Sequence, residues 1–175
     1  PAKIFAKNDG DAPVFVSARR TFAQPLSAVR ADAPATGFSV EKTIFRRERG
    51  RDGNFVLEPA RLKILRPGDE LVVRLTIRAD RDFEFVRVRD LRASGCEPGE
   101  HLSGWRGNGG LRFYAEPRDA ETRFYFERLP AGTHVLEYAQ RVRFSGLYLG
   151  GFAEIRSLYA PEFSAHSSAE TLVSM

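Results

Sequence analysis

Glycine and proline interrupt this chain at short intervals, and their spacing is the strongest constraint on its fold. Among 175 residues there are 15 glycines and 10 prolines, which leave few uninterrupted windows for a helix of ordinary length. This spacing of glycine and proline is typical of short extended segments joined by turns. We therefore expect an all-β chain.

The clearest strand is expected at residues 70–79. Leu71, Val73, Leu75 and Ile77 recur there with a period of two, which places one face of the strand in a core. The four residues before it contain a proline-glycine turn signal. This segment is predicted to be a half-buried strand that follows a tight turn.

Further strands are expected by the same reasoning, at residues 38–45, 83–91, 111–115, 123–129, 133–144 and 171–174. In the segment 133–144, we expect Leu136, Tyr138, Val142 and Phe144 on one face with His134 and Gln140. Strands that recur about every 10 residues without helices between them favour an antiparallel β-sandwich over a parallel sheet.

The N-terminal part differs from the rest of the chain in composition and in the local structure expected of it. Short strands are expected at residues 4–6 and 14–18, around the turn signal Asn8-Asp9-Gly10, and residues 24–37 read as a linker rich in Ala, Pro and Ser. A strand pair alone buries too little apolar surface to be stable. Residues 1–23 are therefore expected to pack on the sandwich or to belong to a neighbouring domain.

Composition narrows the class of protein. Hydrophobic residues make up 42% of the chain and charged residues 29%, as in a globular protein with one core, and no apolar run approaches the roughly 20 residues of a membrane span. The net charge is +4, but the arginines alternate with acidic residues, which indicates a solvated surface and no nucleic-acid partner. The chain begins with Pro1 and no leader, so we expect a removed signal or, preferably, a piece of a longer protein.

No motif in the chain points to catalysis or to a metal. His101, His134 and His166 lack the spacing of a zinc site, and Cys96 has no second cysteine for a disulfide or a tetrahedral set. No serine lies in a nucleophile elbow, and Glu97 beside Cys96 disfavours a thiolate. Carboxylates are plentiful, but no pair stands out. We therefore expect no enzyme, no catalytic residue, no metal and no cofactor.

The glycine-rich stretch at residues 104–110 carries the one candidate ligand site that the residues themselves suggest. It lacks the lysine and the following helix of a phosphate loop, so we interpret it as a hairpin connection. Trp105, with Arg106 beside it, is a candidate stacking platform in this connection. A free-standing sandwich that binds carbohydrate or peptide there stays open as an alternative function.

A series of motifs carries a resemblance to a known family. In order, they are Leu65-Arg66-Pro67-Gly68-Asp69-Glu70-Leu71-Val72-Val73-Arg74-Leu75-Thr76, Val86-Arg87-Val88-Arg89-Asp90, Leu129-Pro130-Ala131-Gly132-Thr133 through Glu137-Tyr138, and Leu158-Tyr159-Ala160-Pro161-Glu162-Phe163-Ser164-Ala165-His166. Their order and spacing resemble the C-terminal macroglobulin-like domain of bacterial alpha-2-macroglobulins. The resemblance implies an immunoglobulin-like or fibronectin-type sandwich at residues 38–175, preceded at residues 1–37 by the end of another domain and a linker.

The resemblance also implies a function. Such proteins are broad-spectrum endopeptidase inhibitors of the bacterial periplasm or cell envelope, which trap a protease that cuts a bait region. Many of them bond to the protease through a thioester in a Cys-x-Glu-Gln motif of a separate domain. Cys96 is followed by Glu97-Pro98, without that glutamine, and so is not a thioester cysteine. The expected partners are the other domains of the parent chain and, through the parent, proteases.

In this family the last domain covers the thioester, and a hydrophobic-tyrosine pair before a proline forms the cover. By this resemblance the matching residues are Leu158 and Tyr159. The physical reason for such a cover is that an aromatic ring with a polar tip can fill a pocket and exclude water from an acyl bond. An alternative is a corner tyrosine whose hydroxyl bonds to nearby backbone. Glu162, Phe163 and His166 also match the family pattern, without an assigned role.

Overall fold

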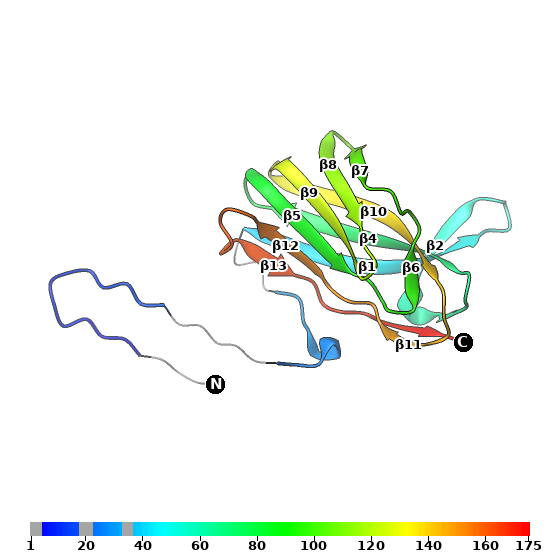
Figure 1. Cartoon of the computed structure of the whole chain (residues 1–175), viewed down its shortest axis with the longest axis horizontal. Coiled ribbons are helices and arrows are strands. Elements are labelled where there is room, and N and C mark those ends of the chain that lie inside the picture. Colours follow the sequence, from blue (N-terminus) through cyan, green and yellow to red (C-terminus); the bar gives the residue numbers. More distant parts are fainter. Residues whose placement is uncertain (1–4, 18–22, 33–36) are drawn as a thin grey trace.

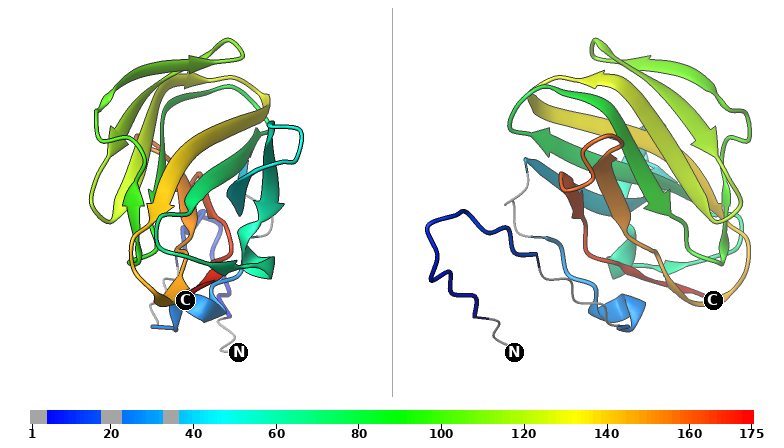
Figure 2. Two further views of the ribbon diagram at one scale, coloured as in Figure 1. Left: turned by 90° about the vertical axis from the view of Figure 1, so that its right-hand side faces the viewer. Right: turned by 60° about the vertical axis from the view of Figure 1, so that its left-hand side comes forward.

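The computed structural model describes residues 5–17, 23–32 and 37–175. Its strands form two large sheets that pack face to face and one small sheet at the end where the C-terminus lies (Figures 1 and 2). The only helical segments of these residues are two 3-10 turns, η1 (Leu26–Ala28) and η2 (Ala60–Leu62). The prediction of an all-β antiparallel sandwich is therefore confirmed.

The first large sheet is antiparallel throughout and has five strands within the described chain. In spatial order they are β2 (Phe55–Pro59), β1 (Phe38–Arg49), β4 (Glu70–Ala79), β10 (Gly132–Val142) and β6 (Cys96–Pro98).

The second large sheet has six strands among the same residues and is also antiparallel. In spatial order they are β13 (Ser164–His166), β12 (Ala153–Ser157), β5 (Phe83–Leu91), β9 (Glu121–Leu129), β8 (Leu111–Pro117) and β7 (Gly104–Asn108).

The small sheet consists of β11 (Gly146–Leu149), β14 (Thr171–Ser174) and β3 (Ile64–Leu65). Its β14–β3 contact is a parallel pair of two residues, an exception to the antiparallel pattern.

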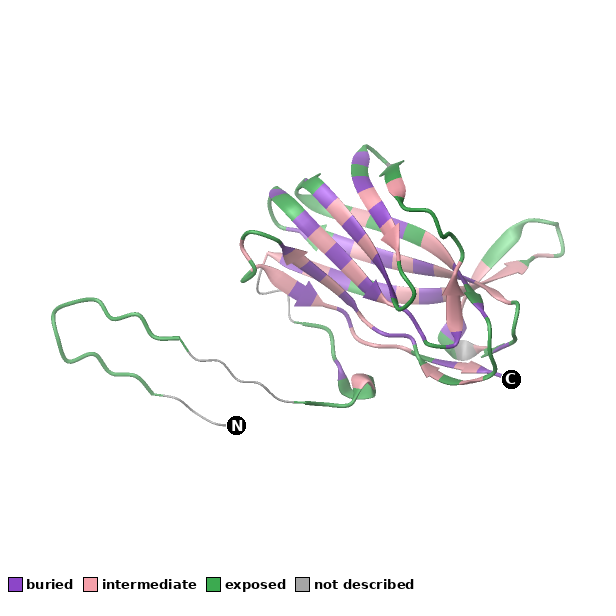
Figure 3. Cartoon of the chain, in the orientation of Figure 1, coloured by how far each residue is buried: buried purple, intermediate pink, exposed green. Residues whose placement is uncertain are grey.

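The core lies between the two large sheets. From β4, the predicted face of Leu71, Val73, Leu75 and Ile77 is fully buried, and the second sheet supplies residues such as Phe126. Buried and less buried residues alternate along the central strands in Figure 3, as the pleat of a strand requires. The period-two prediction for residues 70–79 is confirmed.

The predicted strand at residues 133–144 is too long at its C-terminal end. Leu136, Gln140 and Val142 are buried as expected, but β10 ends at Val142 and Phe144 is exposed. The amides of Arg143 and Phe144 both donate to the carbonyl oxygen of Gly95, at 2.8 and 3.3 Å, and therefore leave the sheet. The neighbouring strand β4 begins opposite Arg141, so β10 has no partner there beyond that point.

The short strands predicted around Asn8-Asp9-Gly10 are wrong where the structure describes them, at residues 5–6 and 14–17. The turn itself forms, because Asn8 Oδ1 accepts the amide of Gly10 at 3.0 Å and Asn8 Nδ2 donates to the carbonyl of Ala12 at 2.8 Å. The flanking residues are exposed, and no described strand supplies their backbone with a partner. Ile4 and Ala18 lie outside the described residues.

The linker predicted at residues 24–37 contacts the sandwich in its described part. Val29 is buried, and the amide of Asp32 donates to the carbonyl of His166 at 3.0 Å. Asp32 Oδ2 in turn accepts the amide of His166 at 2.9 Å. The segment around Val29 and Asp32 is therefore tied to β13, while the division of the chain at residue 37 stays a prediction. No helix in the described part of the chain is long and apolar enough to cross a membrane.

Candidate functional site

A tight loop at residues 157–163 carries the residues that the family resemblance singled out. The loop begins where β12 ends, and Ser157 donates its amide to the carbonyl of Phe163 at 3.0 Å. Inside it, the amide of Phe163 donates to the carbonyl of Ala160 at 3.0 Å, and Pro161 restricts the backbone between them. These two bonds close the loop on itself and leave its tip outside the sandwich.

Leu158 and Tyr159 form the exposed tip of this loop. Leu158 is 45% exposed and Tyr159 81% exposed, which is high for large apolar side chains next to each other. The amide of Leu158 donates to the carbonyl of Phe85 at 2.9 Å, and the Tyr159 ring meets the Phe85 ring edge to face, with the centroids 5.2 Å apart. Phe85, Leu158 and Tyr159 therefore make one apolar apex, which we call the Tyr159 apex.

An unusual backbone conformation places the Phe85 side chain in the apex. Its φ is +51°, and it is the only non-glycine residue with a positive φ among the described residues. The strand changes face there, because Phe83 is buried and the next buried residue is Val86. Sequence reasoning missed Phe85, since an aromatic residue in a β-rich run predicts ordinary strand geometry. Strain of this kind at an exposed aromatic residue is a feature of functional sites.

The corner-tyrosine alternative for Tyr159 is wrong. Within the described residues no hydrogen bond joins the Tyr159 hydroxyl to backbone, and the side chain faces solvent. The neighbouring family-matched residues have structural contacts instead. Phe163 packs edge to face on Phe83 at 5.5 Å, and His166 Nε2 lies 3.1 Å from Asp32 Oδ1, while Glu162 is exposed.

The glycine-rich stretch predicted as a hairpin connection is a strand, β7, followed by a two-glycine turn. Gly109 and Gly110 have φ of +55° and +83°, as tight hairpin turns require, and β8 pairs back on β7. Trp105 is 47% exposed, but the guanidinium of Arg112 lies 4.3 Å from the centre of its ring. One aromatic face of the predicted stacking platform is therefore occupied.

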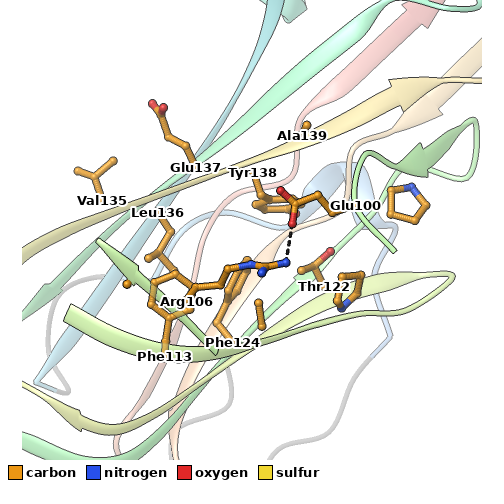
Figure 4. Close-up of a pocket in the computed structure, with 14 residues that line it drawn as sticks. Glu100, Arg106, Phe113, Thr122, Phe124, Val135, Leu136, Glu137, Tyr138 and Ala139 are labelled. Atoms are coloured by element: carbon orange, nitrogen blue, oxygen red, sulfur yellow. Dashed lines mark hydrogen bonds and ion pairs between the residues drawn. The ribbon is translucent and has the colours of Figure 1, made fainter. Parts of the chain in front are cut away.

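The side chain of Arg106 points to the opposite face of β7 from Trp105, because adjacent residues of a strand alternate, although both residues line the shallow surface around the two-glycine turn. Its guanidinium donates to Glu100 Oε2 at 2.7 Å and to the carbonyl of Leu102 at 3.3 Å. Figure 4 shows this pair at a cavity of about 480 Å³, whose lining residues include Arg106 and exclude Trp105. The ligand-binding alternative at Trp105 and Arg106 stays a prediction.

The cavity lies between the two large sheets, on the side where β7 and β10 face each other. Its walls are mainly apolar, and in Figure 4 the side chains of Phe113, Phe124, Leu136 and Tyr138 converge on it. This cavity and the Tyr159 apex lie at opposite edges of the second sheet, because β7 is its last strand and β13 its first. The structure therefore does not bring the two candidate sites together.

A group of polar side chains crosses the interior from one sheet to the other. Lys42 of β1 and Asp90 of β5 are both fully buried, with Lys42 Nζ 2.8 Å from Asp90 Oδ1. The Tyr138 hydroxyl donates to Asp90 Oδ2 and accepts from Gln140 Nε2 at 3.2 Å. Burial raises the pKa of Asp90 and raises that of Tyr138 well above its usual value, because each charged form loses its water.

Cys96 lies on β6, a strand that the sequence analysis did not predict. Burial raises the pKa of its thiol to about 11, because the thiolate would lose water that nearby Arg92 and Lys42 only partly replace. This is the opposite of an activated nucleophile. The described residues contain no cluster of three or more His, Cys, Asp and Glu side chains that could hold a metal ion.

Comparison with known proteins shows which family has this architecture. The family model for the bacterial alpha-2-macroglobulin MG10 domain matches residues 37–162. That match covers both large sheets up to the loop that carries the Tyr159 apex. A comparison with curated proteins found no match.

Solved structures share this fold. A tyrosine-to-glycine mutant of Salmonella alpha-2-macroglobulin is 24% identical, with a TM-score of 0.68. The Salmonella protein reacted with methylamine is 25% identical, with a TM-score of 0.66, and native alpha-2-macroglobulin from Escherichia coli is 22% identical, also with a TM-score of 0.66. The matches cover 86%, 86% and 87% of this chain and 10% of each of those chains.

The fold therefore defines a macroglobulin-like β-sandwich domain. More particularly, the chain belongs to the bacterial alpha-2-macroglobulin family, as its MG10 domain match shows. It spans about a tenth of the length of the solved relatives.

Proposed function

We propose that the chain is the C-terminal domain of a bacterial alpha-2-macroglobulin-like protease trap, and that it catalyses no reaction itself. The family match at residues 37–162 supports this role. A relative whose structure was solved after reaction with methylamine supports the presence of a reactive acyl group in such parents. The domain's work is then to pack against sister domains of the parent chain, which lies in the periplasm or cell envelope.

The Tyr159 apex is the observation that carries the more specific role, the shielding of a thioester. A thioester survives only where water is kept from its acyl carbon. An aromatic ring can fill the space above it and keep a polar tip at the edge. Tyr159 presents such a ring outside the fold, and its hydroxyl is not engaged by the described residues.

The rest of the apex supports the same role by holding Tyr159 in place. The hydrogen bond from Leu158 to Phe85 and the edge-to-face contact of the two rings restrict the tip of the loop. A side chain held in advance loses less conformational entropy when it enters a pocket on another domain. Leu158, Tyr159 and Phe85 together form the proposed cover, with Tyr159 as the residue that reaches the thioester.

The trap itself is tested with the intact parent and trypsin. A protease enclosed in the parent should lose activity toward large protein substrates and keep activity toward a short chromogenic peptide, because only the large substrate is excluded. Trypsin that stays equally active on both substrates at excess parent would overturn the proposed function. Heat-denatured parent is the matched control.

A further inference from the structure

The ion pair between Lys42 and Asp90 occupies two core positions of facing sheets. On β1, Lys42 takes an inward position between Val40 and Ile44, where the pattern of the strand calls for an apolar residue. On β5, Asp90 takes the inward position after Val86 and Val88. Both side chains are inaccessible to water. A buried ion pair is rarely more stable than an apolar pair of similar size, so stability alone does not account for these two residues.

The Lys42 side chain has backbone partners in addition to Asp90. Lys42 Nζ lies 2.8 Å from Asp90 Oδ1, yet this oxygen accepts no hydrogen bond among the described residues. Nζ instead donates to two backbone carbonyls, that of Leu91 at 2.7 Å and that of Gly150 at 2.5 Å. A neutral amine has two N–H bonds and one lone pair. With both N–H bonds directed at these carbonyls, the remaining direction is available to the carboxyl group of Asp90.

We propose that Lys42 and Asp90 react with each other to form an intramolecular isopeptide bond that joins the two sheets of the sandwich. The proposal makes this pair a self-modification site, independent of the protease-trap function. The reaction needs no oxidant, reductant or cofactor, because an amine and a carboxylic acid give an amide and water.

The step begins with a proton transfer from the Lys42 ammonium to Asp90 Oδ1, which leaves both groups neutral. Burial favours the neutral carboxylic acid in this step, since it raises the pKa of Asp90. The lone pair of Nζ then attacks Cγ of Asp90, and the C–Oδ1 bond breaks. Oδ1 leaves as water with its own proton and one proton from Nζ. The amide keeps Oδ2 as its carbonyl oxygen and one N–H for a backbone carbonyl.

Tyr138 acts on the reacting atoms directly. Its hydroxyl donates to Asp90 Oδ2, the oxygen that gains negative charge when Nζ attacks Cγ. Gln140 Nε2 donates to the same hydroxyl at 3.2 Å and so fixes its orientation. Fixed reactants in a site without water can reach effective concentrations on the order of 10⁵ M or more, which favours the attack of Nζ on Cγ.

Mass spectrometry of the folded, monomeric chain under denaturing conditions tests the proposal. We expect a mass lower than that of the sequence by one water, and a branched tryptic peptide that joins the segments containing Lys42 and Asp90. The full sequence mass, also after prolonged incubation of the folded chain, would overturn the proposal. So would a water loss that maps elsewhere, such as a succinimide at Asp52-Gly53, which has the same mass.

Two variants sharpen the result. Lys42→Arg keeps a positive charge but cannot form the amide, so it should keep its full sequence mass, and a water loss in this variant would contradict the assignment. Tyr138→Phe keeps the ring and removes the hydroxyl. We expect its linked fraction to increase at least several-fold more slowly after refolding than that of the wild type. An unchanged rate would remove Tyr138 from the reaction.

Discussion

Cys96 shows at the residue scale how burial decides chemistry. The Cys96 thiol could be mistaken for the reactive cysteine of a thioester protein, but its buried surroundings make it unreactive. A pKa of about 11 leaves a thiolate fraction of about one in a thousand near pH 8. Neither a covalent bond to a protease nor a regulatory oxidation is expected at this position.

Alkylation kinetics test this residue. Native Cys96 should react with iodoacetamide at least about a hundredfold more slowly near pH 8 than the same thiol in guanidinium chloride, because unfolding returns it to an ordinary pKa. The native rate should still rise with pH through about pH 10. A native rate equal to the denatured rate would contradict the buried environment.

Gly151 lies in the connection between β11 and β12, and a larger residue there would deform that element. Its φ is +69°, and an added Cβ would lie 2.3 Å from the carbonyl oxygen of Leu91 on β5. Gly151→Ala should therefore lower the free energy of unfolding by about 3 kcal/mol, from backbone strain and overlap together. Gly110→Ala is the control, because its φ is +83° but a Cβ there meets nothing within 4 Å.

Urea denaturation compares the two variants. The Gly110→Ala chain should lose only about 1 kcal/mol, the strain of the left-handed conformation alone. Equal losses at the two glycines would show that the close approach of Gly151 to β5 does not constrain the sandwich.

The strained residue of β5 gives a second prediction at this scale. Both Phe85→Gly and Phe85→Ala remove the ring, so their difference reports the backbone conformation alone. With φ at +51°, the glycine variant should be more stable than the alanine variant by about 1 kcal/mol.

Glu84 is the control, because it is exposed and has no positive φ. There the alanine variant should be more stable than the glycine variant, since glycine in a strand costs about 0.5–1 kcal/mol relative to alanine. The same order at both positions in thermal unfolding would contradict a left-handed Phe85.

The long alternating strands were predictable from sequence, as was the four-residue β14, but several other short strands were not. Residues 70–79 carry a clear period of two, and β4 has those bounds. The strand β12 has only five residues and β6 only three, too few for a periodic signal. Leu158 and Tyr159 were found through the order of family motifs, whereas Phe85 was not, because a change of face within a strand has no sequence signature.

The sequence also could not predict which side chains that are distant along the chain come together. Lys42 and Asp90 meet only because β1 and β5 lie in facing sheets, and the side chains of Arg106 and Trp105 point to opposite faces only because their segment is a strand. In both cases tertiary structure, rather than local pattern, decides which chemistry-bearing groups come together.

For the whole molecule, the structure divides the N-terminal segment into two parts. Residues 5–17 are exposed, including Phe15 at 98%, whereas Val29 and Asp32 contact the sandwich. Removal of residues 1–17 should change the free energy of unfolding by less than about 0.5 kcal/mol.

Removal of residues 1–32 is the matched control. It exposes the surface that Val29 covers and deletes the contacts of Asp32 with His166, so it should cost about 1–3 kcal/mol. A large loss from the shorter deletion in chemical denaturation would mean that the first residues stabilise the sandwich.

The central claim for the whole molecule is that the Tyr159 apex keeps water and small nucleophiles from a thioester of the parent chain. It is tested most directly by the rate at which methylamine reacts with the intact parent, measured by the thiol released. Tyr159→Ala should raise this rate about ten- to a hundredfold, because burial of an aromatic ring is worth roughly 1.5–3 kcal/mol. Trp105→Ala, at the opposite edge of the sheet, should leave it unchanged. Equal rates for Tyr159→Ala and the wild-type parent would contradict the shielding role.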